Sequence, residues 1–136
     1  LMMATIATAT AQVALDEAIG YARSRETFGK RLADHQVIRH KIVEMARQIN
    51  ATRAYRDAIA WRVGQGESPV ADLSMLKVQA TLTLEFCARE AAQIFGGAGY
   101  SLGTKVERIY REVRVNAIGG GSEEIMRDLA ARQMAL

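Results

Sequence analysis

The chain has 136 residues, 49% of them apolar, so it is long enough for one domain with a buried core and too apolar for a disordered segment. Its net charge is only +3 and both signs are interspersed, without the basic block or aromatic series typical of nucleic-acid-binding proteins. The single cysteine, Cys87, excludes an intrachain disulfide and a cysteine-cluster metal site. Its apolar neighbours indicate a buried structural thiol in a reducing, cytosolic-type compartment.

No stretch is long and apolar enough to span a membrane, and residues 1–6 lack the charged head and cleavage pattern of a signal peptide. Residue 1 is not a methionine, and the first residues resemble a helix that is entered partway along. We therefore expect residues 1–136 to form one domain that is a piece of a longer polypeptide.

A first helix, ending near residue 24, is predicted by apolar residues that step by four, three and four along one face: Met2, Ile6, Ala9 and Val13. Phe28-Gly29 interrupts this pattern, and the loop continues to Asp34, which we expect to cap the next helix. We find no convincing strand here or elsewhere in the chain.

The same spacing predicts a second helix, which ends at Gly64–Glu67: Ile38, Ile42, Met45 and Ile49. Ser68 is the expected N-cap of a third helix, with Pro69 at its first position. This helix should end at Gly96-Gly97 and bury one apolar face: Leu76, Ala80, Leu84, Cys87, Ala91 and Ile94.

A short helical segment is expected at residues 104–111, followed by an extended or irregular stretch at 113–118. Ser122, followed by Glu123 and Glu124, is a strong start signal for a last helix, because the hydroxyl can cap it and the acids favour its positive end. Four main helices in succession predict an all-α fold, an antiparallel up-and-down four-helix bundle.

The first segment that could carry chemistry is residues 25–30. Arg25 offers a planar fork of donors suited to phosphate oxygens, Thr27 a hydroxyl, and Phe28 an apolar face for a ring. Gly29 lets the backbone turn. The same residues also fit an ordinary helix end with a C-cap glycine and a solvated arginine, and composition alone favours that interpretation.

The second segment is residues 93–100, where a glycine-rich run follows a helix and exposes backbone to close approach. Gln93, one turn earlier, can present its amide to a ligand. A helix stop with a tight turn is the alternative. No strand precedes the glycines, so a dinucleotide-binding βαβ unit is excluded.

The third segment is residues 119–124. Three glycines before a helix start could bind an anion, but Glu123 and Glu124 would repel phosphate, so a ribose or adenine ring fits better. His35 and His40 have no third ligand at metal spacing, and a metal role for them is not expected.

These segments, in this order, resemble the carboxy-terminal helical domain of the acyl-CoA dehydrogenase family. The resemblance covers essentially the whole chain, and the ordered set is highly specific although each motif is modest. The matching stretches are Ala14–Ala18, Tyr21-Ala22, Arg25–Lys30, His35-Gln36, Met45-Ala46, Gln93–Tyr100, Arg108–Glu112 and Ile118–Ile125.

The resemblance implies a flavoprotein that places FAD at a subunit interface of a homo-oligomer, commonly a homotetramer built as a pair of dimers. Arg25 and Gln93 would contact the pyrophosphate region of an FAD held mainly by a neighbouring subunit, and Ser122 and Glu124 would touch the adenosine end. The cofactor-binding set that it implies is Arg25, Thr27, Phe28, Gln36, Gln93, Gly97, Ser122 and Glu124.

The family reaction is the α,β-desaturation of an acyl-CoA thioester, in which a glutamate removes the α-proton and electrons leave to an electron-transferring flavoprotein. Gly120 matches the position of the base in short- and medium-chain members and cannot transfer a proton. In the isovaleryl- and long-chain-like branch the glutamate lies on the first helix, just before the position of Leu1. We therefore expect the longer protein to belong to that branch, in a bacterial cytoplasm or a mitochondrial matrix, and the chain alone to be inactive.

Two alternatives remain open. The longer protein could lack a base altogether and act as a flavin-binding subunit or as a flavin-dependent oxidase or monooxygenase, with which Gly120 is compatible. The chain could also be a helical interaction module without a cofactor.

Overall fold

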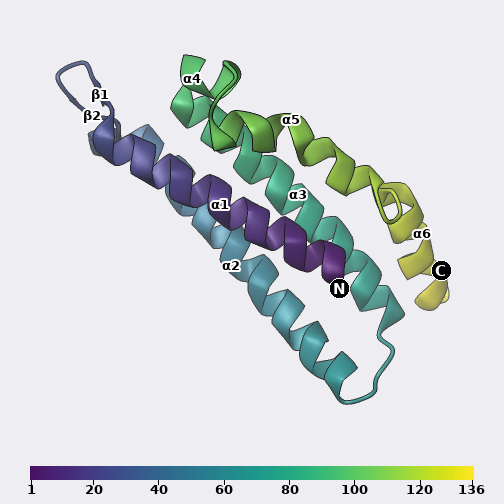
Figure 1. Ribbon diagram of the computed structural model, residues 1–136. Helices are drawn as coiled ribbons and strands as arrows, with labels where there is room; N and C mark the ends of the chain where they lie inside the picture. The colour runs from purple at the N-terminus through teal and green to yellow at the C-terminus, as the bar shows by residue number, and fades with distance from the viewer.

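The computed structural model describes residues 1–136 and is an antiparallel helical bundle (Figure 1). Four helices alternate in direction along the chain: α1 (Met2–Ser24), α2 (Gln36–Gly64), α3 (Val70–Phe95) and α5 (Lys105–Ile118). A short helix, α4 (Gly97–Tyr100), follows α3, and α6 (Glu123–Gln133) follows α5 and packs on α3. The predicted all-α four-helix architecture is confirmed. None of the helices combines the length and apolar character that crossing a lipid bilayer demands.

Helix α3 lies at the centre of the bundle and packs against α1, α2, α5 and α6. All six residues of its predicted apolar face are buried. On α2, Met45 and Ile49 are buried as expected, and Thr52 pairs with Thr83 of α3 through hydroxyls 2.9 Å apart. Cys87 is buried as expected, and burial raises the pKa of its thiol to about 12.

Helix α1 buries a face other than the one that the apolar spacing marks. Met2, Ile6 and Val13 are exposed. The side packed on the core is lined by small residues that let α1 approach α3 closely: Ala4, Ala7, Ala11, Ala14, Ala18 and Ala22.

The segment between α1 and α2 contains two strands that the sequence did not predict. β1 (Glu26–Thr27) and β2 (Lys30–Arg31) form an antiparallel pair whose two-residue loop is Phe28-Gly29. Both loop residues have positive φ angles, +52° and +77°, as in the turns that match the twist of a hairpin. The hairpin was missed because two-residue strands leave no alternation of apolar and polar residues.

Two of the three expected caps are wrong. The Asp34 carboxylate accepts a hydrogen bond from the guanidinium of Arg31, and Asp34 lies in a 3-10 turn, η1 (Leu32–Asp34). His35 therefore precedes α2, and it provides no side-chain cap. Pro69 rather than Ser68 is the residue before α3, which starts one position later than expected. The third cap is confirmed, because the Ser122 hydroxyl accepts the backbone N–H of Ile125.

The irregular stretch expected at residues 113–118 is also wrong, since α5 continues to Ile118. The valines favoured an extended conformation by local propensity, but burial decides the outcome. Val106, Ile109, Val113 and Ala117 recur at helical spacing and are all buried, so packing against α3 and α1 stabilises the helix.

Candidate functional site

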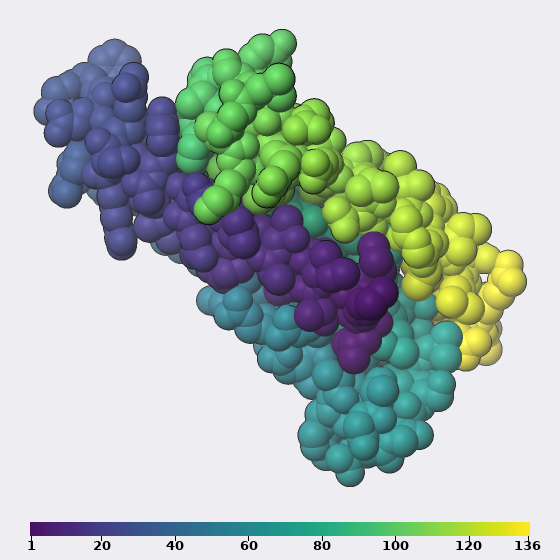
Figure 2. Space-filling model, in the orientation of Figure 1, coloured from purple at the N-terminus to yellow at the C-terminus, as the bar shows by residue number.

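Two of the three predicted segments meet at one end of the bundle. The hairpin that follows α1 and the α4 region that follows α3 project side by side there, with a notch between them (Figures 1 and 2). The rings of Tyr21 and Phe95 stack beneath this notch with centroids 4.1 Å apart and planes inclined by 16°. This pair fixes the end of α1 against the end of α3.

Arg25 is held by its backbone and free at its side chain. Its N–H donates to the carbonyl of Tyr21 at 2.9 Å, and its carbonyl accepts the N–H of Leu32 at 2.8 Å. The guanidinium is exposed, and no carboxylate or carbonyl of the chain engages it. A fixed backbone with a free, permanently charged fork of donors suits an anionic group that comes from outside the chain.

The notch is an open hollow of about 500 Å³ that joins the two segments. Arg25 and Thr27 line it from the hairpin, and Gly96 and Gly97 line it from the end of α3 and the start of α4. Phe28, at the hairpin tip, is 96% exposed and has a positive φ angle, so it makes little contact with its own bundle. The ring is therefore available for a contact with another molecule.

Gln93 lines a neighbouring groove of about 800 Å³ that shares Gly96 and Gly97 with the notch. Its amide is exposed and has no partner within the chain. A Cβ atom added at Gly97 would meet no atom within 4 Å, whereas one at Gly99 would lie 2.5 Å from the carbonyl oxygen of Ala92. The chain's own packing therefore requires glycine at position 99, and position 97 is open toward the groove.

Gln36 is the first residue of α2, close in sequence to the hairpin, and is exposed. Its amide nitrogen lies 3.4 Å from Nε2 of His40. It lines neither of the two hollows that hold Arg25, Thr27 and Gln93.

Ser122 and Glu124 lie at the other end of the bundle, beside the start of α1 (Figure 1). α1, about 35 Å long at 1.5 Å per residue, separates them from Arg25. The pKa of the Glu124 carboxyl is lowered by its own backbone N–H and by the Ser122 hydroxyl. A Cβ atom at Gly120 would lie 3.4 Å from Cγ of Met3, so the glycine turn touches the first turn of α1.

Sequence reasoning missed two features of these sites. Tyr21 and Phe95 stand directly before the two motifs, but nothing in their spacing shows that their rings stack. Lys77, about two turns into α3, reaches the glycine turn with its ammonium group. Its only signal was a charge in a helix whose neighbouring positions are apolar.

The whole chain matches one family model. Residues 1–135 fit the model described as "Acyl-CoA dehydrogenase, C-terminal domain". Among curated proteins, the acyl-CoA dehydrogenase AFT10-1 of Alternaria alternata is 38% identical, over 90% of this chain and 31% of its own length. The probable acyl-CoA dehydrogenase YdiO of Escherichia coli K12 is 36% identical, over 98% of this chain and 35% of its own length.

Solved structures agree. A probable acyl-CoA dehydrogenase from Mycobacterium abscessus superposes with a TM-score of 0.95 at 45% identity, over 97% of this chain and 35% of that one. Butyryl-CoA dehydrogenase from Megasphaera elsdenii gives a TM-score of 0.94 at 30% identity, over 98% and 35% of the two chains. This chain therefore spans about a third of the length of these relatives. It belongs to the acyl-CoA dehydrogenase family, as the C-terminal helical domain.

Proposed function

We propose that the chain supplies part of the FAD site of an acyl-CoA dehydrogenase that desaturates acyl-CoA thioesters at the α,β-position. The observation that carries this proposal is the shared end of α1 and α3, where a free guanidinium, a hydroxyl and a free amide surround two connected hollows. A pyrophosphate carries two negative charges and many acceptor oxygens. Arg25 offers donors and charge to such a group, and Gln93 and Thr27 offer neutral hydrogen bonds.

Gly97 fits the same ligand, because the chain leaves open the space that a side chain would fill there. Phe28 and Gln36 complete the proposed set around the hairpin. Ser122 and Glu124 are proposed for the adenosine end, where a hydroxyl and a carboxylate can bond to ribose hydroxyls.

The two sets lie at opposite ends of α1, so we assign them to two different FAD molecules. One chain would then complete the site of a neighbouring chain with Arg25 and Gln93, and contribute to a second site with Ser122 and Glu124. This arrangement needs at least two copies of the chain, which supports a homo-oligomer, with the family's homotetramer as the proposed form.

Bound FAD would accept the hydride that leaves the β-carbon. The matching proton must leave the α-carbon to a base, and the glycine turn offers none, since Gly120 has no side chain. The contact between Gly120 and the first turn of α1 supports a base on α1, because a carboxylate just before Leu1 would act in the same neighbourhood. We place the protein in the isovaleryl- and long-chain-like branch on this ground. An electron-transferring flavoprotein is the proposed electron acceptor.

The test uses the protein that carries this domain, purified with its flavin. Arg25→Ala should weaken FAD binding by roughly 10- to 100-fold, because a charged hydrogen-bonding partner of the pyrophosphate is lost. Arg23→Ala is the matched control, since it removes the same charge two residues earlier, from the last turn of α1. Full flavin content in Arg25→Ala, with a wild type that binds FAD, would contradict the assignment.

Anaerobic addition of acyl-CoA thioesters should bleach the flavin absorbance of the wild-type protein. A second candidate function, that of a flavin protein without a base, is favoured by the absence of a side chain at Gly120. It predicts full flavin content without bleaching by any acyl-CoA.

A further inference from the structure

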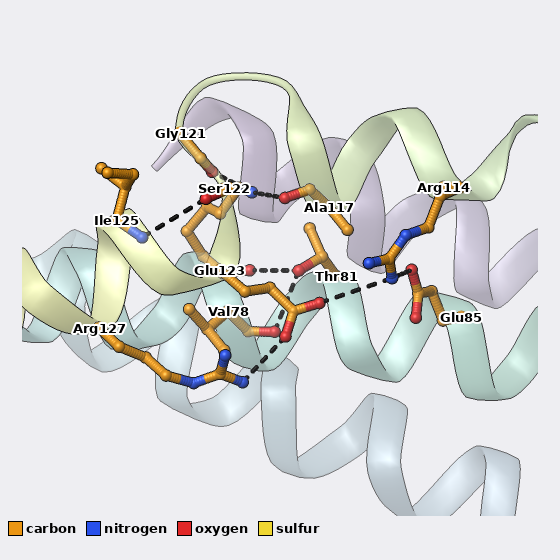
Figure 3. A network of polar contacts seen from close by, with 11 residues as sticks. Val78, Thr81, Glu85, Arg114, Ala117, Gly121, Ser122, Glu123, Ile125 and Arg127 are labelled. Carbon is orange, nitrogen blue, oxygen red and sulfur yellow. Dashed lines mark hydrogen bonds and ion pairs between the residues drawn. The ribbon is translucent and has the colours of Figure 1, made fainter.

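A buried positive charge binds the backbone of the glycine turn, residues 119–121, between α5 and α6. Lys77, on α3, is 5% exposed, and its ammonium donates to two carbonyl oxygens, that of Ala117 at 2.7 Å and that of Gly121 at 2.6 Å. Figure 3 shows these two carbonyls converging from opposite limbs of the turn. No carboxylate lies within ion-pair distance of the ammonium.

The charge is compensated by the backbone rather than by an acid. Ala117 is the second-last residue of α5, so its carbonyl is among those that a helix leaves without an internal partner at its negative end. Lys77 thus caps α5 from a neighbouring helix and ties the cap to Gly121 on the far limb. Desolvation lowers the pKa of Lys77, and Glu123 and Glu124 nearby oppose that shift.

The turn has few means of holding its own shape. Residues 119–121 are all glycine, and Gly121 has a φ angle of +107°, which other residues rarely adopt. On the α6 side the backbone is fixed through Glu123, whose carboxylate lies 2.9 Å from Arg127 and 3.8 Å from Arg114 (Figure 3). On the α5 side, Lys77 provides the corresponding anchor.

We propose that Lys77 is a positioning residue for the cofactor site: by fixing the Gly121 carbonyl, it sets the peptide that leads into Ser122 and so places the Ser122 hydroxyl and the start of α6. The inference rests on the proposed function, because that function assigns Ser122 to the adenosine end of FAD. Lys77 itself is buried and acts only through the turn.

The experiment compares FAD affinity in four variants of the protein that carries this domain, two single variants, their double variant and a control, each measured on folded protein only. K77M keeps a long side chain but removes the charge and the donors, and should weaken FAD binding about tenfold. R53M is the matched control, because Arg53 of α2 also ties two helices together, through a hydrogen bond of 2.9 Å to Gln12 in the middle of α1, away from both ends of the bundle. It should lower the free energy of unfolding but change FAD affinity by less than about twofold.

A double variant separates positioning from general damage. If Lys77 acts through Ser122, then K77M combined with S122A should bind FAD no more weakly than the worse single variant. Additive losses, or equal FAD affinities for K77M and R53M, would overturn the inference. A wild type that binds no FAD would instead overturn the proposed function. Should K77M fail to fold, K77Q, which keeps an amide donor without the charge, carries the same comparison.

Discussion

The two ends of the bundle differ in how their polar groups are used. At the hairpin end, Arg25 and Gln93 have fixed backbones and free side chains, so the chain presents donors that it does not use itself. At the turn end, Lys77 and Glu123 are engaged in the chain's own contacts, and Gly120 is the exposed residue of the glycine turn. The difference suggests two ways in which the proposed ligand contacts are prepared. The hairpin end offers side chains without partners in the chain, and the turn end offers a backbone whose conformation is restrained.

Glycine has different roles at the hairpin end, and this gives the largest expected effect. Gly99→Ala should lower the free energy of unfolding by about 3 kcal/mol, because the new Cβ would press on the carbonyl oxygen of Ala92 at 2.5 Å. Gly97→Ala should change it by less than about 0.5 kcal/mol, since nothing lies within 4 Å. Urea unfolding measures both. Equal losses would remove the distinction between a glycine needed for packing and one left open for a ligand.

At the turn end the expected cost is smaller and comes from backbone conformation. Gly121→Ala should destabilise the fold by about 1–2 kcal/mol, because its φ angle of +107° is strained for alanine. The nearby Met126 sulfur, 2.8 Å from the new Cβ, can move aside. Gly20→Ala, in the interior of α1, should stabilise the fold by about 0.5–1 kcal/mol. Thermal unfolding of both variants checks the opposite signs, and a stabilising Gly121→Ala would mean that the turn relaxes freely.

The smallest effect concerns pH, and both ends share it. The Asp34 carboxyl at the hairpin end has a lowered pKa because of its hydrogen bond with Arg31, and the Glu124 carboxyl at the turn end because of its backbone N–H and Ser122. A carboxyl whose pKa is lower in the folded state contributes stability above its unfolded pKa and loses it as the pH falls through the folded value.

Carbon-13 titration of the carboxyl groups should therefore place the midpoints of Asp34 and Glu124 below their ordinary values of 3.8 and 4.5. Glu124→Gln removes one titrating group. The free energy of unfolding of this variant should therefore fall less than that of the wild type between about pH 6 and pH 3. An identical fall in both proteins would show that Glu124 is not held by the turn.

The bundle could be predicted from the sequence because burial follows helical spacing on α2 and α3, as Met45, Ile49 and Leu84 show. On α1 the same logic marked Met2, Ile6 and Val13, which are exposed, since alanines rather than large residues make that interface. Helix α5 was cut short because the β-propensity of its valines was counted without their burial.

The hairpin-end site was predictable as two segments, and its assembly was not. Arg25 and Gln93 lie far apart in sequence, and their elements meet because α1 packs along α3, with Tyr21 stacked on Phe95 at the end of that contact. The hydrogen bonds from Lys77 to the turn could not be predicted either, because a lysine inside a helix normally extends into water.

The alanine face of α1 has a mechanical consequence. Methyl groups have no rotamers, so six of the eight buried side chains of α1 cannot rearrange to absorb a displacement. The two helices should therefore move largely as one rigid unit. If α1 were tilted at Arg25, its other end should move as well, which would displace Met3, beside Gly120. The two proposed cofactor sites, at opposite ends of α1, would then be strained or relaxed together.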